Sequence, residues 1–178
     1  MVARRCIGWV AVFGVIVFSA NVTDARPSQS DRPSWPRLEL PDPVARLAAR
    51  EALDNAWELL GQRDCAGVLR DFADRAERRL DERLTAQSVD ARTYLTMLVF
   101  IDGSRDKVCI TGGFGFTVPG SRVVRLCPAE VKRTWDQQPA HATANMIHEL
   151  LHTLGLGENP PSSKQITQRV LAACHREQ

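Results

Sequence analysis

The stretch that most constrains this 178-residue chain is HELLHTLGLGE, at residues 148–158. A helix advances about 100° per residue, so His148 and His152 lie one turn apart and can direct two imidazole nitrogens at a shared point. Glu149 projects from the flank of the same face. The pattern predicts a helix with one polar and one apolar face. The polar face carries His141, Asn145, His148 and His152, and the apolar face Met146, Ile147, Leu150, Leu151 and Leu154.

The residues after this helix indicate where it ends and how the chain continues. Gly155 is suited to the C′ position of a Schellman cap, which requires a positive φ, with Leu156 in contact with Leu151. After such a stop the chain can turn back, and the first side chain able to bind a metal is Glu158. Because paired imidazoles at this spacing are typical of zinc ligands, we predict a zinc ion at this helix.

The same residues resemble a known family. His-Glu-x-x-His followed by x-x-Gly-x-x-ligand is similar to the extended signature of the metzincin branch of the zincin-type zinc metallopeptidases. The resemblance covers residues 148–158 only. It implies that His148, His152 and Glu158 bind Zn²⁺, and that Glu149 is the general base acting on a metal-activated water.

Two features depart from the family pattern. The third ligand is usually His or Asp, whereas this chain has Glu158 at that position. No methionine follows Met146, so the chain has no Met-turn. Glu177 and His175 are the alternative third ligands, and Glu158 is favoured because a side chain so close to the chain end would be frayed.

The resemblance implies a secreted zinc-dependent endopeptidase that hydrolyses peptide bonds of a peptide or protein substrate. The alternative is a non-catalytic secreted or envelope binding protein that keeps a zincin fold and a structural metal. An open cleft above the two histidines favours the enzyme, whereas a fourth protein ligand favours the structural site. A disulfide-stapled domain without metal is the third class, and it would contain no zinc after purification.

The N-terminus is typical of an exported protein. Arg4 and Arg5 precede an apolar run, Cys6–Ala20, and small residues follow near residue 25. This pattern predicts a signal peptide at 1–25, because the run is too short to span a membrane. We therefore expect a secreted or periplasmic protein with no stable membrane insertion after cleavage. Residues 26–43 are proline-rich and predict an extended linker.

Export determines how the cysteines are interpreted. The chain has five cysteines, and removal of Cys6 with the signal peptide leaves four for an oxidising compartment. Of the three possible pairings we favour Cys109–Cys127 and Cys65–Cys174, because the first pair lies in two strand-like segments joined by a turn. The formal net charge of +2 gives no reason to expect a nucleic-acid partner. Nothing in the sequence indicates an oligomeric state.

The remaining patterns predict an α+β fold of zincin type, in a single domain at 44–178. We expect N-terminal helices, a small mostly antiparallel sheet, the active-site helix and a C-terminal helix. The first helix begins at Pro43 with Asp42 as its N-cap and ends at Gly61, and the last begins at a Ser162–Gln165 capping box. A second helix is predicted over 66–84, strands over 94–101, 107–111, 114–118 and 122–127, and a short helix or turn over 128–135.

Two details of these elements carry specific expectations. In the first helix the core stripe is predicted to be Val44, Leu47, Ala48, Ala52, Trp57 and Leu60. Glycines surround Phe114 and Phe116, which predicts either a bulged hairpin with two core phenylalanines or an open sheet edge to which a peptide can add as a strand.

Overall fold

The computed structural model describes residues 35–174, which belong to one compact unit. The predicted signal peptide, residues 26–34 of the predicted linker, and the alternative ligands His175 and Glu177 lie outside the described residues. The unit is α+β. Its elements are β1 (Arg37–Glu39), α1 (Pro43–Leu60), α2 (Arg63–Ala66), the 3₁₀ turn η2 (Gly67–Arg70), α3 (Leu80–Thr85), α4 (Ala91–Thr96), β2 (Val99–Asp102), α5 (Lys107–Ile110), β3 (Gly115–Thr117), β4 (Val123–Leu126), α6 (Pro128–Gln137), α7 (Pro139–Thr153) and α8 (Ser163–Cys174).

The sheet has four strands in the order β1-β2-β4-β3. β1, β2 and β4 run parallel to their neighbours, and only the edge strand β3 is antiparallel. The prediction of a mostly antiparallel sheet is therefore wrong. Parallel neighbours need crossover connections, and these are supplied by α1 to α4 between β1 and β2 and by α5 with β3 between β2 and β4.

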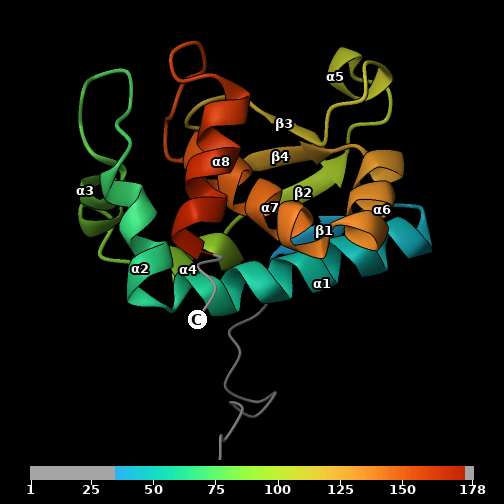
Figure 1. The fold of residues 1–178 in the computed structure, drawn as a ribbon, viewed down its shortest axis with the longest axis horizontal. Coiled ribbons are helices and arrows are strands. Elements are labelled where there is room, and N and C mark those ends of the chain that lie inside the picture. The colour runs from blue at the N-terminus through green and yellow to red at the C-terminus, as the bar shows by residue number, and fades with distance from the viewer. Residues whose placement is uncertain (1–34, 175–178) are drawn as a thin grey trace, which may run out of the picture. The chain divides into compact units, whose positions relative to one another are not determined.

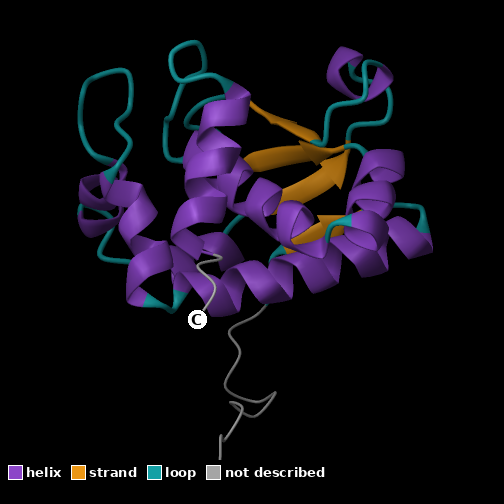
Figure 2. Cartoon of the chain, in the orientation of Figure 1, coloured by secondary structure: helices purple, strands orange, loops and turns teal. Residues whose placement is uncertain are grey.

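Helices pack on the sheet so that α7 lies across it. Figure 1 shows α7 in front of the strands, α1 along the side of the sheet nearest β1, and α8 packed on α7. The helical and strand layers are distinguished in Figure 2. Phe100 on β2 and Val124 on β4 are buried, and the edge strand β3 lies beside the C-terminal half of α7, where Thr117 donates a hydrogen bond to Glu149. This arrangement places the predicted site helix between a sheet edge and α8.

Helix α1 begins and ends as predicted, but its buried face differs. Asp42 accepts hydrogen bonds from the backbone N–H groups of Val44 and Ala45, and the helix ends before Gly61. Val44 and Leu47 are 61% and 60% exposed, so their assignment to the core stripe is wrong. An alanine-rich face packs instead, because small side chains let α6 and α7 approach closely. Its buried residues are Ala45, Ala48, Ala49, Ala52, Leu53, Ala56, Trp57 and Leu60.

The prediction of one helix over 66–84 is wrong. The chain forms α2, η2 and α3 instead, separated by a loop at 71–79. Asp74 accepts hydrogen bonds from the backbone N–H groups of Ala76 and Arg78, at 2.8 and 3.0 Å. An aspartate that binds local backbone in this way competes with helix formation, so the loop replaces the middle of the helix.

Two of the predicted strands are also corrected. Residues 94–101 divide into the end of α4 and the strand β2, because Asp90 caps α4 by accepting from the N–H of Thr93. Residues 107–111 form the short helix α5 rather than a strand. The strands predicted over 114–118 and 122–127 are confirmed as β3 and β4, and the helix over 128–135 as part of α6.

The last part of the predicted linker is folded. Arg37–Glu39 pair with Val99–Ile101 as strand β1, and Leu40 is buried. Within residues 35–174, no helix combines the length and apolar character needed to cross a membrane.

Both favoured disulfides are present. Cys65–Cys174 joins α2 to the end of α8, and Cys109–Cys127 joins α5 to the residue that precedes α6. The pairing is confirmed although Cys109 lies in a helix and not in a strand as predicted. Disulfides of this kind are typical of proteins in oxidising compartments.

The two disulfides should differ in their contribution to stability. They span 109 and 18 residues. The chain-entropy relation gives a loss of about 4.8 kcal/mol for removing the longer link and about 3.2 kcal/mol for the shorter. Chemical denaturation of the Cys65→Ala/Cys174→Ala and Cys109→Ala/Cys127→Ala proteins measures this difference. A larger loss of unfolding free energy from the second pair would contradict the expectation.

Candidate metal centre

The end of α7 forms the predicted Schellman cap. Gly155 has φ +107°, its N–H donates to the carbonyl of His152 at 2.9 Å, and the N–H of Leu156 donates to the carbonyl of Leu151 at 3.2 Å. These are the paired hydrogen bonds of the motif. They turn the chain back over the last turn of the helix, so residues 156–158 return to the histidines.

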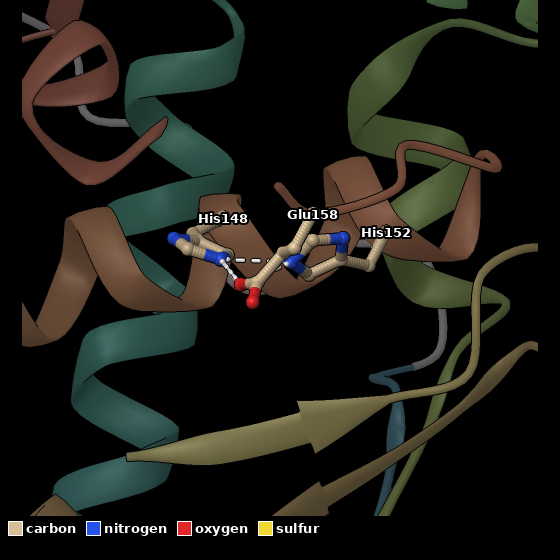
Figure 3. A group of neighbouring side chains, drawn as sticks. All are labelled: His148, His152 and Glu158. Atoms are coloured by element: carbon tan, nitrogen blue, oxygen red, sulfur yellow. Dashed lines mark hydrogen bonds and ion pairs between the residues drawn. The ribbon is translucent and has the colours of Figure 1, made fainter. Parts of the chain in front are cut away.

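The side chains of His148, His152 and Glu158 come together at this turn. The Nε2 atoms of the two histidines are 2.8 Å apart, and Oε1 of Glu158 is 3.4 Å from Nε2 of His148 and 3.3 Å from Nε2 of His152. Figure 3 shows the carboxylate of Glu158 directed between the two rings. Among residues 35–174 these three form a group whose ligand atoms all lie within 4.8 Å of one another.

The Nδ1 atom of each imidazole makes a hydrogen bond that orients the ring. Nδ1 of His152 lies 2.7 Å from the backbone carbonyl of Leu156, which can only accept, so Nδ1 carries the proton. Nδ1 of His148 lies 2.8 Å from the hydroxyl of Thr167 on α8, and that hydroxyl donates to the side-chain oxygen of Asn145. Thr167 therefore accepts from Nδ1 of His148. In both neutral rings the lone pair of Nε2 is then directed at the shared point.

Burial favours the neutral, ligand-competent form of one of the histidines. Burial lowers the pKa of His148 to about 3, with a smaller contribution from the neighbouring His152. A neutral imidazole is the form that binds a metal. The Nε2 atoms and the carboxylate are all acceptors, so a cation is required between them, either a proton or a metal ion.

The donor set fits a metal ion such as zinc. Ligand atoms about 2.0–2.2 Å from a tetrahedral ion are roughly 3.3 Å apart. The two nitrogen–oxygen separations of 3.3 and 3.4 Å match that value, and the nitrogen–nitrogen separation of 2.8 Å is shorter. All four cysteines of the described unit are in disulfides, so none competes as a ligand. The outer hydrogen bonds are of the kind that orient metal-binding histidines.

Glu149 occupies a separate position beside this group. Glu149 is 6% exposed, and its Oε2 accepts a 2.6 Å hydrogen bond from the hydroxyl of Thr117 on β3. Burial raises the pKa of Glu149, the hydrogen bond from Thr117 offsets part of that rise, and the negative charge of Glu158 adds to it. Gly115 makes room for the carboxylate, because a Cβ at that position would lie 3.2 Å from Oε1 of Glu149.

These groups line one open cleft of about 590 Å³ between β3, α7 and the loops at 71–79 and 155–162. Glu149, His148, His152 and Glu158 contribute to its wall, as do Phe114 and Phe116. Tyr94, the only tyrosine, is outside it: the ring is buried and the hydroxyl donates to the carbonyl of Thr153. Tyr94 is thus a core residue.

The structure brings the four predicted site residues together but adds supporting residues that the sequence analysis did not assign. Thr167, Thr117 and the carbonyl of Leu156 contact the site through hydrogen bonds. Thr167 lies 19 residues from His148 and Thr117 lies 32 residues from Glu149. No local spacing connects such pairs. Of the supporting residues, only Asn145 could be linked to the site from the sequence, because it lies on the polar face of the same helix as His148 and His152.

Comparison with protein-family models, with curated proteins and with solved structures finds no match. The resemblance to zincins therefore rests on residues 148–158 alone, and the candidate metal site rests on the geometry of His148, His152 and Glu158.

Removing the support of His148 should weaken metal binding without removing a ligand. The Thr167→Val protein loses the acceptor for Nδ1, and zinc affinity should fall about 10- to 100-fold. Competition with a chromophoric chelator measures it. Thr85→Val is the matched control, since Thr85 is an exposed helical threonine on α3 whose hydroxyl donates to its own helix. Equal affinities in both variants would contradict the outer-sphere role of Thr167.

Glu158 should behave as a ligand. Glu158→Ala should lower zinc affinity by at least about 100-fold, more than an outer-sphere change, whereas Glu158→His should restore much of it because imidazole is a common zinc ligand. Isothermal titration measures both, with Glu51→Ala on the exposed side of α1 as control. Parent-like affinity in Glu158→Ala would move the third ligand to Glu177, His175 or an upstream side chain.

Proposed function

We propose that this protein is a secreted zinc-dependent endopeptidase. The observation that supports the proposal most is the convergence of two oriented histidines and Glu158 in an open cleft that also contains the buried carboxylate of Glu149. Three protein ligands leave a coordination position for water, as catalytic zinc sites do. The disulfides fit the oxidising compartment that secretion or export to a periplasm implies.

In the proposed hydrolysis, the metal site and Glu149 have separate roles. When bound, zinc supplies a Lewis acid that polarises the scissile carbonyl and lowers the pKa of water. Glu149 takes a proton from the attacking water and delivers it to the amine nitrogen of the leaving group. Its raised pKa suits this exchange, because a carboxyl with a pKa nearer neutrality both accepts and returns a proton.

Two contacts keep Glu149 in place for that exchange. The hydroxyl of Thr117 holds one carboxylate oxygen, and the absence of a side chain at Gly115 lets the other lie against β3. A bound carboxylate loses little orientational freedom on going to the transition state. Glu149 can then serve as a base without being a ligand.

The edge strand β3 offers a binding mode for a peptide. Only one side of β3 is paired, with β4, among the described residues, and β3 lines the cleft. An extended peptide can add to the open side through backbone hydrogen bonds. Phe116, which is 40% exposed, can contact its side chains. This supports the open-edge interpretation of the glycine-rich segment.

The alternative proposal is a non-catalytic secreted or envelope binding protein with a structural metal. A structural zinc is normally closed by four protein ligands. The metal-ligand group in residues 35–174 contains three, and the cleft beside it is open. These two observations favour the enzyme.

Replacing Glu149 separates catalysis from metal binding. The Glu149→Gln protein should bind zinc like the parent, because Glu149 lies outside the ligand group, but its peptide hydrolysis should fall about 10²- to 10⁴-fold for want of a base. Metal content and cleavage of an unfolded protein substrate measure the two properties, with Glu51→Gln as control. Unchanged hydrolysis would remove Glu149 from the mechanism, and loss of zinc would make Glu149 a ligand.

A further inference from the structure

The loop at 71–79 contributes Arg75 to the wall of the cleft that contains the candidate metal site. Its ends form an antiparallel bridge between Ala73 and Arg79, and the N–H of Asp74 donates to the carbonyl of Arg78 at 2.8 Å. The carboxylate of Asp74 also accepts from the guanidinium of Arg78, at 3.1 and 2.9 Å. The side chain of Asp74 is only 7% exposed. The loop is therefore held in one conformation by its own buried aspartate.

This loop packs against the turn that carries Glu158. A Cβ on Gly155 would lie 3.1 Å from Cβ of Asp74, and a Cβ on Gly157 would lie 3.7 Å from Nε of Arg75. Figure 1 shows the loop between η2 and α3 rising next to the loop that follows α7. The packing directs the guanidinium of Arg75 over Gly157, next to Glu158 in the sequence.

Arg75 is the only lysine or arginine among the described residues that line the cleft. Glu158, which follows Gly157, already directs Oε1 at the two histidines, and no ion pair joins it to Arg75 within residues 35–174. The five N–H donors of a guanidinium match a carboxylate in a two-point contact. An exposed arginine on a loop at the wall of the cleft thus offers a recognition element for a negative charge.

We propose that Arg75 binds a carboxylate of the substrate, so that the cleft selects acidic peptides. The carboxylate belongs either to an aspartate or glutamate side chain or to the C-terminus of the substrate. The inference rests on the proposed peptidase function. In this role Arg75 determines specificity and does not contact the scissile bond.

The test uses the mature, zinc-loaded protein and synthetic peptides in matched sets. Within a set, the peptides differ only by Glu, Gln or Lys at one position, and each is made with a free and an amidated C-terminus. Mass spectrometry identifies the cleaved bond and gives relative kcat/KM values. The proteins are the parent, Arg75→Gln, Arg75→Glu and the control Arg79→Gln, whose arginine is on the same loop but does not line the cleft. Zinc content is measured for each.

For the parent, a carboxylate at one position relative to the cleaved bond should raise kcat/KM about 10- to 100-fold, the range of a hydrogen bond to a charged group. Arg75→Gln should remove this preference, Arg75→Glu should reverse it in favour of Lys, and Arg79→Gln should keep it. All four proteins should contain equal zinc. If amidation alone abolishes the preference, the recognised carboxylate is the C-terminus, and if it has no effect, the carboxylate is a side chain.

Other outcomes overturn the inference. Cleavage by the parent without preference for a carboxylate, or a preference that persists in Arg75→Gln, refutes the role of Arg75 but leaves the peptidase function standing. Loss of zinc in Arg75→Gln would show that Arg75 positions Glu158 instead. Absence of cleavage of every peptide by the zinc-loaded parent would refute the peptidase function and the inference together.

Discussion

The arrangement depends on one electrostatic constraint: two imidazole nitrogens and a carboxylate oxygen lie within 3.4 Å of one another with no donor among them when the rings are neutral. Their lone pairs repel unless a cation lies between them. The acceptors on Leu156 and Thr167 fix this orientation by holding the two Nδ1 protons. A proton can satisfy two of the three acceptors, whereas a metal ion satisfies all of them.

The fold holds these groups together through elements that serve two purposes. The Schellman turn at Gly155 ends α7, returns Glu158 to the histidines and supplies the carbonyl of Leu156 to His152. Helix α8 carries Thr167 to His148, and its C-terminal end is tied to α2 by Cys65–Cys174. The antiparallel edge strand β3 places Thr117 on Glu149. Stability and site geometry are therefore properties of the same contacts.

The parts that could be predicted from the sequence are those set by local chemistry. The N-cap at Asp42, the glycine stop at Gly155 and the Ser162–Gln165 capping box each depend on residues within one turn, and the structure confirms them. The histidine pair and the nearby Glu158 belong to the same class, because a single helix and its cap bring them together. The three were predicted as a group, and the structure places them as one.

The predictions that failed depend either on contacts between distant segments or on local side-chain-to-backbone hydrogen bonds, neither of which hydrophobic spacing reports. The predicted strand direction was wrong because residues 107–110 resemble a strand in sequence but form the helix α5. This helix is part of the crossover connection that makes β2 and β4 parallel. The helix predicted over 66–84 was interrupted because Asp74 binds backbone that periodicity does not consider. Thr167 and Thr117 were missed because their partners are far along the chain. Hydrophobic spacing contains no information about such pairs.

The central claim is that the three converging side chains hold a zinc ion, and zinc-edge X-ray absorption on the purified protein after zinc supply tests it most directly. The account predicts one zinc per chain with two imidazole nitrogens and a carboxylate oxygen at about 2.0–2.2 Å and no sulfur ligand. Less than stoichiometric zinc, or a coordination shell without paired imidazoles, would contradict it.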